Sequence, residues 1–428
     1  MPIEQNEPLE PAANKFSSPL HATFHSLRFR NFRLYFCGQI ISNTGNWLTN
    51  VALTLLILQR THSGLAVGIL AACQFGPILL LSAYGGVIAD RYNKRRALLI
   101  TQSLEMAESV GLAVLAFMPH TSVYPFYIVA AVGGTLLAFD NPLRRSFVSE
   151  MVPAGAVANA VVLYSTIVNT ARVLGPALAG ALVVTVSYGW AFTVDAVSYL
   201  AVICSLILMR EAELHRTKPR PREKGEIYAG LRYVLRSPVL LINFAMLLVI
   251  GTAAYNFNTT LPLFVTKGLH AANGTYTILY SLMGLGSVVT ALIVAHRNLV
   301  KLRHVIGGAV AMSVTMLLLA VAPNVYLAAP VALLLGAGSI VYTTATTSLV
   351  QLTAEGHVRG RVLALQTILL VGTTPLGSPL LGWLADTYGG RTPLLAGGCI
   401  ALATAAGGYI WAKRLPGTNS KKVTGISN

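Results

Sequence analysis

Long apolar runs separated by short polar segments repeat along the whole chain of 428 residues. A helix needs about 20 consecutive apolar residues to cross a bilayer, and twelve runs are long enough to be read in this way. The runs are continuous and do not alternate, which argues against a transmembrane barrel. We therefore predict an all-helical membrane protein. Its predicted spans are 34–58, 65–88, 97–117, 123–139, 158–186, 190–208, 239–264, 276–295, 305–321, 326–350, 362–385 and 393–412.

A charged stretch at 210–237 interrupts this pattern after the sixth predicted span. It contains Lys-Pro-Arg-Pro-Arg-Glu-Lys at 218–224, and prolines and like charges keep a chain extended and solvated. We therefore predict two six-helix halves, joined by a linker. The predicted boundaries are a cytoplasmic tail (1–30), the first half (31–209), a cytoplasmic basic linker (210–237), the second half (238–412) and a cytoplasmic tail (413–428).

Composition and charge place these spans in a bilayer. Only 11% of the residues are charged, against about 25% in a soluble domain. The net charge of +16 comes from basic residues clustered in alternate loops, the positive-inside pattern, and this pattern puts both termini in the cytoplasm. No basic patch interleaved with aromatic residues is present, so we expect no nucleic-acid partner. The predicted outer loops hold little more than Arg60, Lys267 and Arg391.

The segment 86–96 joins the second and third predicted spans and reads Gly-Val-Ile-Ala-Asp-Arg-Tyr-Asn-Lys-Arg-Arg. Asn93 can take the left-handed conformation of a tight turn. The segment resembles the loop between the second and third helices of the major facilitator superfamily of secondary transporters, usually Gly-x-Leu-Ala-Asp-Arg-x-Gly-Arg-Lys. The alternative is a basic turn of any multi-span protein. The resemblance implies a conformational-switch motif containing Gly86, Asp90, Arg91, Lys94 and Arg95.

Two further stretches narrow the resemblance. They are 139–147, which reads Phe-Asp-Asn-Pro-Leu-Arg-Arg-Ser-Phe, and 195–199, which reads Asp-Ala-Val-Ser-Tyr. Both are similar to the branch that includes the enterobactin exporter and the macrolide-efflux proteins. The resemblance implies a multi-pass exporter of the bacterial inner membrane whose halves rock about a midplane cavity. It also implies coupling to inward proton flow.

Asp140 and Arg144 stand four residues apart at a predicted helix end, so their side chains can pair. With Asp90 and Arg91 they are expected to form a cytoplasmic charge cluster. We interpret this cluster as a latch that holds the two halves together in the outward-facing state. The alternative is a static anchor of the loop.

Ionisable residues inside a span are costly, about 2.5–3.5 kcal/mol each, so those present need a role. Glu105 and Glu108 share a face of the third predicted span, and two carboxylates in a low dielectric suit a proton carrier. The alternative is that they are structural partners of nearby basic loop residues, because the third helix lies at the periphery in the superfamily. The candidates for proton coupling are Glu105, Glu108, Asp140 and Asp195.

Arg172 is the candidate for binding an anionic group. It follows Ser165 and Asn169 on one face of the fifth predicted span, and such a polar stripe should face a cavity. Asp195 in the sixth span could approach Arg172, although the two differ in predicted depth.

Two more stripes complete the predicted substrate cavity. Gln39, Asn43, Asn46 and Asn50 recur at steps of four, three and four in the first span, where hydrocarbon contact would be unfavourable. The second half offers hydrogen-bonding groups and no acidic residue in its seventh to tenth spans. A cavity with charge on one wall and apolar surface on the other suits an amphipathic organic molecule. The candidates in the second half are Tyr255, Asn256, Asn258, Thr343, Thr347 and Gln351.

Small residues mark the fifth span as a packing helix. Gly175, Pro176 and Gly180 let helices approach closely, and a Gly-Pro-rich fifth helix is typical of exporters in the superfamily. The alternative is ordinary tight packing. Gly377 and Gly382 repeat the spacing in the eleventh span. A second repeat, Gly-x-x-Ala-Asp at 86–90 and 382–386, should lie at opposite membrane faces, so we take the two copies as unrelated.

Other functions are disfavoured. No phosphate-binding Gly-Lys-Ser/Thr loop is present, so direct ATP drive is not expected, and neither is an enzymatic activity. The four cysteines lie in apolar runs without metal spacing, so we expect no metal or other cofactor. The remaining alternatives are a lysophospholipid flippase and a non-transporting membrane sensor. The expected partners are a small-molecule substrate, protons and the lipid bilayer, and the expected state is a monomer.

Overall fold

The computed structural model describes residues 24–215, 226–294 and 301–414. These residues form helices and connecting turns and contain no strand, which confirms the all-helical prediction. The first bundle consists of α2 (Arg30–Thr61), α3 (Gly64–Arg91), α4 (Lys94–Phe117), α5 (Tyr124–Val148), α6 (Val157–Thr185) and α7 (Tyr188–Ile207). The second consists of α9 (Pro238–Ala253), α10 (Phe257–Leu263), α11 (Asn273–Val294), α12 (Leu302–Val321), α13 (Val325–Thr353), α14 (Gly356–Val371), α15 (Thr374–Tyr388) and α16 (Thr392–Arg414).

Eleven helices or joined helix pairs of the described residues are long and apolar enough to cross a membrane. The predicted first span, which corresponds to α2, is not among them. The polar residues at its centre lower its mean hydropathy, although its 32 residues exceed the length that a bilayer requires. Helix α2 packs against α6 and α7, and Leu48, Val51 and Leu55 in its middle are buried. Protein therefore covers much of a helix whose composition suits lipid poorly.

Two of the predicted spans are broken. The seventh consists of α9, α10 and the π-helical turn η4 (Phe264–Gly268), and the eleventh consists of α14 and α15. Asn256 lies at the first break, where its side chain donates to the carbonyl oxygens of Gly251 and Thr252 at 3.1 and 2.8 Å. These bonds occupy backbone acceptors that the interrupted helix leaves free, which hydrocarbon would not satisfy.

The linker prediction is wrong in part. Residues 226–236 form the helix α8 (Glu226–Arg236), which packs against α9 and α14. Val234 is buried with Leu240 and Val362 in a small core of its own. The apolar face of this helix outweighs the solvating effect of its charges. The Lys-Pro-Arg-Pro-Arg-Glu-Lys sequence at 218–224 lies outside the described residues.

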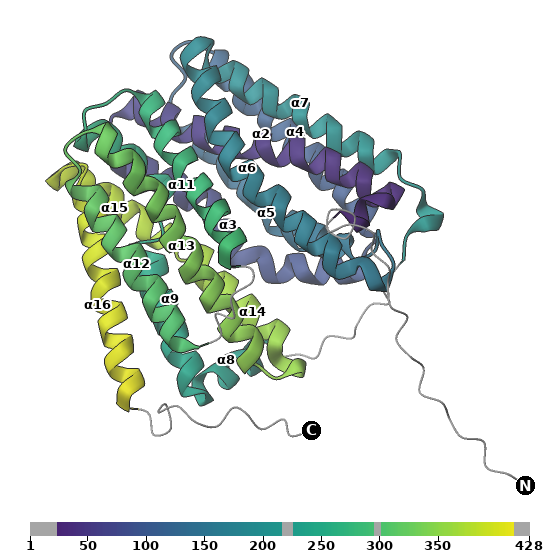
Figure 1. The fold of residues 1–428 in the computed structure, drawn as a ribbon. Helices are drawn as coiled ribbons and strands as arrows, with labels where there is room; N and C mark the ends of the chain where they lie inside the picture. Colours follow the sequence, from purple (N-terminus) through teal and green to yellow (C-terminus); the bar gives the residue numbers. More distant parts are fainter. Residues whose placement is uncertain (1–23, 216–225, 295–300, 415–428) are drawn as a thin grey trace, which may run out of the picture.

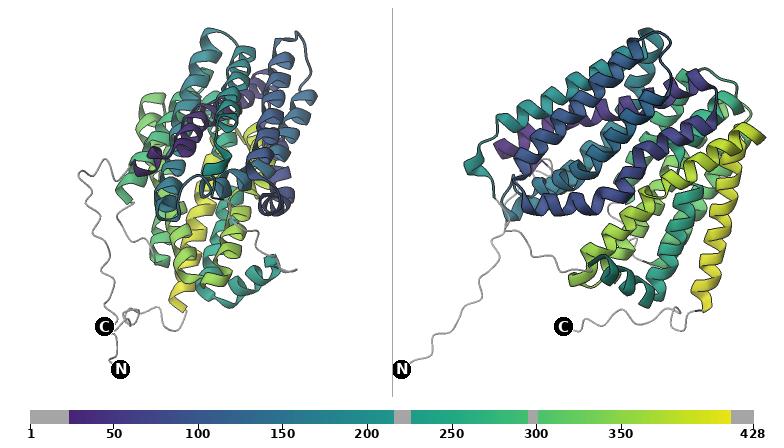
Figure 2. Two further views of the ribbon diagram at one scale, coloured as in Figure 1. Left: turned by 90° about the vertical axis from the view of Figure 1, so that its right-hand side faces the viewer. Right: turned by 180° about the vertical axis from the view of Figure 1, so that it is seen from behind.

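The two bundles meet along two seams, α3 with α15 and α6 with α11 (Figure 1). The close backbone contacts of these seams lie toward one side of the molecule, where Gly64 and Gly382 meet and where Gly180 meets Thr277. On the opposite side, where α4 and α14 begin, the bundles diverge, as Figure 1 and the right view of Figure 2 show. We call the first the closed side and the second the open side.

The repeated glycine spacing has a counterpart in space. A Cβ atom added to Gly175 would lie 2.4 Å from Trp47 Cβ, and one added to Gly377 would lie 1.9 Å from the carbonyl oxygen of Thr252. Each of these glycines thus faces the first long helix of its own bundle. Gly180 and Gly382 instead face the other bundle, at Thr277 and at Gly64. The predicted correspondence between the glycines of α6 and α15 is therefore confirmed. In each helix the first glycine packs within its own half, and the second packs across the seam.

Glycine contacts also hold the second bundle together, and this generates a stability prediction. A Cβ atom on Gly336 of α13 would lie 1.8 Å from the carbonyl oxygen of Met283 in α11. We expect Gly336→Leu to lower the stability of the protein by about 2 kcal/mol or more, because the helices must separate. The midpoint of thermal unfolding in detergent micelles measures this loss.

The control is Gly307→Leu in α12. Gly307 is exposed and has no neighbour within 4 Å of an added Cβ atom, so its midpoint should stay at that of the parent. Equal midpoints for both variants would contradict the view that this backbone contact stabilises the bundle.

Candidate functional site

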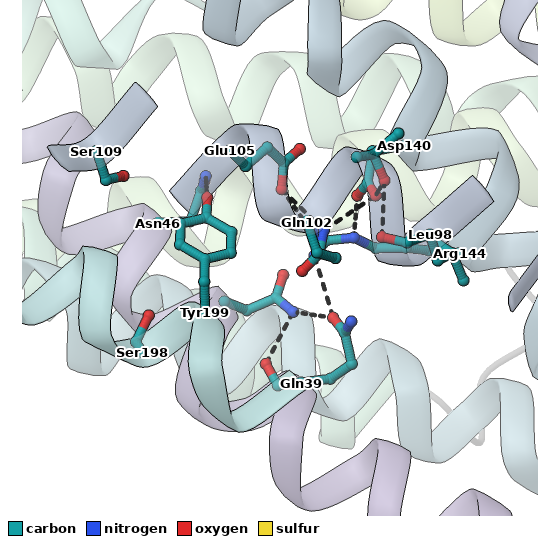
Figure 3. Close-up of polar contacts among 12 residues, drawn as sticks. Gln39, Asn46, Leu98, Gln102, Glu105, Ser109, Asp140, Arg144, Ser198 and Tyr199 are labelled. Carbon is teal, nitrogen blue, oxygen red and sulfur yellow. Dashed lines mark hydrogen bonds and ion pairs between the residues drawn. The ribbon is translucent and has the colours of Figure 1, made fainter. Parts of the chain in front are cut away.

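Arg144 lies inside the first bundle between two carboxylates. Its guanidinium forms an ion pair with Asp140 on the same helix and a second, at 3.0 Å, with Glu105 Oε2 on α4. It also donates to Gln39 Oε1 on α2 at 3.0 Å (Figure 3). All four side chains are buried. The predicted pairing of Asp140 with Arg144 is confirmed, and the pair joins three helices of one half.

Neighbouring side chains complete this network. Thr101 Oγ1 donates to Asp140 Oδ1 at 2.6 Å, and Gln102 Nε2 donates to Glu105 Oε2 at 2.8 Å and to Asp140 Oδ1 at 3.0 Å. Two oxygens of the network, Glu105 Oε1 and Gln102 Oε1, are buried without a hydrogen-bond partner. The network therefore places two carboxylates against the single positive charge of Arg144, and one carboxylate oxygen stays without a donor.

Most of the polar stripe on α2 faces the interior of its own half. Gln39 accepts from Arg144, Asn43 Nδ2 donates to Gln39 Oε1 at 2.7 Å, and Asn46 Nδ2 donates to Tyr199 on α7 at 3.3 Å. Asn50 reaches the other half, where it accepts from Asn258 Nδ2 at 3.2 Å. The sequence pattern locates the stripe. It does not reveal that the first three residues contact the interior of the first half while the fourth contacts the second half.

A partly open pocket of about 70 Å³ lies beside this network and is lined by residues of the first half. Its lining includes Asn46, Asn50, Gln74, Glu105, Glu108 and Tyr199. Within the described part of the chain Glu108 has no hydrogen bond or ion pair of its own. An ionised carboxylate in this position would be costly, so a proton or a solvent molecule must compensate it.

Asp195 is buried on α7 and accepts from Ser109 Oγ at 2.7 Å and from Ser198 Oγ at 3.4 Å. It does not pair with Arg172. The predicted approach of these two residues is therefore wrong, because Asp195 faces α4, whereas the Arg172 side chain extends from α6 onto Trp47 of α2. Like Glu108, Asp195 has no cationic partner among the described residues, and its hydrogen-bond donors are two serine hydroxyls.

A second polar group lies at the meeting of the two halves. The Arg172 guanidinium carbon lies 5.2 Å from the centre of the Trp47 ring, and that ring lies 6.2 Å from the ring of Tyr280 on α11. The Tyr280 hydroxyl donates to Asn258, which in turn donates to Asn50. We call these five residues the seam cluster.

The seam cluster contains two aromatic residues that the sequence analysis did not select. Trp47 and Tyr280 have no periodic signal that separates them from lipid-facing aromatic residues. The close approach of α6 to α2 brings Arg172 onto Trp47, and Gly175 permits that approach because it has no side chain. Arg172 Nε is buried and has no hydrogen-bond partner among the described residues.

The side chains of the other predicted cavity residues form hydrogen bonds within the protein. Asn256 is buried, and its Oδ1 accepts from Ser378 Oγ at 3.2 Å, so it serves the helix break. Asn169 donates to the Ser165 carbonyl oxygen at 2.9 Å on its own helix. Thr343 and Thr347 bond to backbone oxygens of α13, and Thr347 also accepts from Gln366 at 2.8 Å.

The basic loop after α3 is held mainly within the first half. Lys94 pairs with Glu150, and Arg95 pairs with Glu211 at 2.5 Å. Asn93 has an extended backbone and its side chain caps α4, so the predicted left-handed turn is wrong. Arg91 is exposed. Gly86 and Asp90 lie in the last turns of α3, and the surroundings of both residues are outside what the structure describes.

No group of three or more His, Cys, Asp or Glu side chains in the described residues could hold a metal ion. The arrangement instead offers carboxylates that can take up protons and a cation–aromatic–amide cluster between two bundles.

Comparison with known proteins places the chain. The family of transmembrane secretion effectors matches residues 21–426. The staphyloferrin A transporter of Staphylococcus aureus is 26% identical over 83% of this chain and 90% of its own length. The enterobactin exporter EntS of Salmonella typhimurium is 25% identical over 82% and 85%, and the multidrug efflux pump Tap of Mycolicibacterium fortuitum is 26% identical over 83% and 90%.

Solved structures share the fold at low identity. The peptide-transporter-family protein PepTSo matches with a TM-score of 0.76 at 11% identity, over 90% of this chain and 98% of its own. A bacterial homologue of the lysosomal transporter Spinster, in an inward-facing conformation, matches with a TM-score of 0.71 at 13% identity, over 90% and 97%.

The chain is thus a multi-pass transporter of small molecules in the bacterial inner membrane, and not an enzyme. It belongs to the transmembrane secretion effector family of the major facilitator superfamily, in the branch that includes the enterobactin exporter.

Proposed function

We propose that the protein exports an amphipathic small molecule that carries an anionic group, a siderophore or a drug-like compound. The observation that carries this proposal is the seam cluster. It presents the charge of Arg172, two aromatic rings and two amides where the halves meet. An anion can bind the guanidinium while the apolar part of the molecule packs on Trp47 and Tyr280. The relatives named for staphyloferrin A and enterobactin support such a substrate.

The proposed mechanism is alternating access by a monomer with twelve spans and cytoplasmic termini. This count includes α2, whose 32 residues suffice to cross a bilayer. The halves are taken as 31–209 and 238–412, joined by the basic linker 210–237 and flanked by tails 1–30 and 413–428. The basic residues of the loops before α4 and within the linker then lie inside. The open side is cytoplasmic, so the structure corresponds to an inward-open state.

In this state the predicted switch motif lies on the open side. We propose that Gly86, Asp90, Arg91, Lys94 and Arg95 engage the second half when the cytoplasmic side closes. The buried pair of Asp140 with Arg144 would support this surface from within the first half. That role modifies the latch that the sequence suggests, because the pair itself contacts only its own half.

Coupling to inward proton flow is the proposed drive. Four carboxylates, Glu105, Glu108, Asp140 and Asp195, share the interior of the first half with the guanidinium of Arg144. Glu105 and Asp140 are committed to that guanidinium. Glu108 and Asp195 have no cationic partner in the described residues, so they are the carboxylates that can exchange a proton at low cost.

The first experiment measures transport of a substrate panel by purified protein in proteoliposomes, with and without an imposed pH gradient. We expect gradient-driven movement of an anionic amphipathic compound. Movement of lysophospholipid alone, with every soluble compound left behind, would replace the exporter by a flippase.

Arg172 provides the test of substrate binding. We expect Arg172→Gln to raise the substrate concentration for half-maximal transport about tenfold or more, because a charged hydrogen bond is lost. Arg172→Lys should recover part of the loss, since lysine keeps the charge without the planar group. Arg60→Gln is the matched control, because Arg60 also stacks on a ring, that of Phe126, at 5.0 Å within the first half. An unchanged half-maximal concentration in Arg172→Gln would remove Arg172 from the binding site.

Glu108 and Asp195 test the coupling. We expect Glu108→Gln and Asp195→Asn to abolish uphill transport driven by a pH gradient, because neither amide can take up a proton. Exchange of substrate across the membrane without a gradient should persist. Glu213→Gln is the control, because Glu213 is exposed and pairs only with Arg210 among the described residues. Gradient-driven transport by a variant that lacks both carboxylates would show that the proton is carried elsewhere.

A further inference from the structure

Asp386, in the last turn of α15, binds the start of a helix in the other half. Its carboxylate accepts from the backbone N–H groups of Gly64 at 2.6 Å and Leu65 at 3.0 Å. It also accepts from Ser63 Oγ at 2.8 Å. All three donors belong to the beginning of α3 in the first half, whereas Asp386 belongs to the second. The contact therefore lies across the α3–α15 seam on the closed side.

The donors explain why this contact is strong. The first N–H groups of a helix have no acceptor within the helix, and they carry the positive end of its dipole. A carboxylate is the acceptor that matches them best. Usually a residue just before the helix supplies the cap, and Ser63 does accept from Ala66 N at 3.3 Å. Here an additional cap comes from the opposite half, so it can exist only while the halves are closed at this side.

A lysine of the second half orients the carboxylate. Lys267 Nζ lies 2.5 Å from Asp386 Oδ1, and both side chains are about three-quarters covered, with exposures of 27% and 25%. Because Lys267 and Asp386 move together with their half, this ion pair need not break when the halves separate. It limits the carboxylate to positions that also face α3.

The backbone at the seam is shaped for this contact. A Cβ atom on Gly382 would lie 2.1 Å from the Gly64 carbonyl oxygen, and one on Gly68 would lie 2.4 Å from the Ser378 carbonyl oxygen. Side chains at either position would hold α15 away from α3. The glycines thus bring the last turn of α15 within hydrogen-bond reach of the first turn of α3.

The residue pattern at this contact repeats a pattern of the switch motif. Gly382, Ala385 and Asp386 reproduce the spacing of Gly86, Ala89 and Asp90. The sequence alone suggests that the two copies are unrelated, because they lie at opposite faces. In the structure the first copy ends α3 on the open side, and the second copy binds the beginning of α3 on the closed side. One copy of the pattern therefore lies at the end of α3, and the other, on α15, contacts the beginning of α3.

We propose that Asp386 is the latch of the closed side: its bonds to the start of α3 hold the inward-open state and must break for release of substrate to the outside. This inference rests on the alternating-access mechanism proposed above. It assigns to the second half a residue that controls which state the transporter occupies, apart from binding of substrate or protons.

The test measures distances between spin labels in the full-length protein after its four cysteines are replaced by serine. One label pair, at Ser122 and Tyr326, reports on the closed side, and another, at Gly155 and Gln351, reports on the open side. All four positions are exposed. We expect Asp386→Asn to raise the population with a longer Ser122–Tyr326 distance about tenfold, because the charge-assisted bonds across the seam are lost. The Gly155–Gln351 distance should shorten in the same population.

Two further variants make the result specific. Thr387→Ala changes the neighbouring residue, whose hydroxyl donates to the Trp383 carbonyl oxygen of its own helix, and should leave both distances as in the parent. Ser63→Ala removes one of the three cross-seam donors and leaves α15 intact, so it should shift the populations in the same direction by less. If Asp386→Asn does not yield monodisperse protein, Ser63→Ala decides the question.

Two results would overturn the latch. If the parent populates both states and neither Asp386→Asn nor Ser63→Ala shifts them, Asp386 has no such role while alternating access stands. If the parent shows one fixed set of distances with substrate and at every pH, alternating access fails, and the latch fails with it.

Discussion

Hydrocarbon cannot satisfy a charge, and this constraint explains how the first half is built. Arg144 would cost several kcal/mol in lipid, so helices α2, α4 and α5 surround it with Gln39, Glu105 and Asp140. Because the cluster is shared by three helices, it also fixes how they pack. The cavity beside it, the burial of Asp195 and the inward direction of the α2 stripe all follow from keeping charge away from lipid.

The second half packs most of its helices without acidic side chains. No acidic side chain occurs in α9 to α14, and backbone contacts at Gly286, Gly336 and Gly377 bring its helices together. A bundle held by backbone contact and apolar side chains can move as a rigid body against its partner. The chemical difference between the halves thus suits a transporter in which one half holds the titratable groups and the other supplies the opposite wall.

Span positions were predictable because their cause is local. A helix must supply about 20 consecutive apolar residues to cross a bilayer, and such runs can be recognised in the sequence directly. The breaks at Asn256 and between α14 and α15 were not predictable from local patterns. At the first break the freed carbonyl oxygens accept from the Asn256 side chain, which in turn accepts from Ser378 of the distant helix α15. The helix α8 was missed for a similar reason: its apolar face gains stability only against α9 and α14.

The sequence by itself determined the membrane class, the two groups of helices, the glycine echo and the pairing of Asp140 with Arg144, because these depend on composition, periodicity or a four-residue step. Only the tertiary structure decided which side chains face one another. It turned Asp195 away from Arg172, brought Trp47 and Tyr280 beside that arginine, and joined Asp386 to Gly64. These contacts link residues as far as 322 positions apart, and rotation of one helix by a fraction of a turn would abolish them, so no local pattern records them.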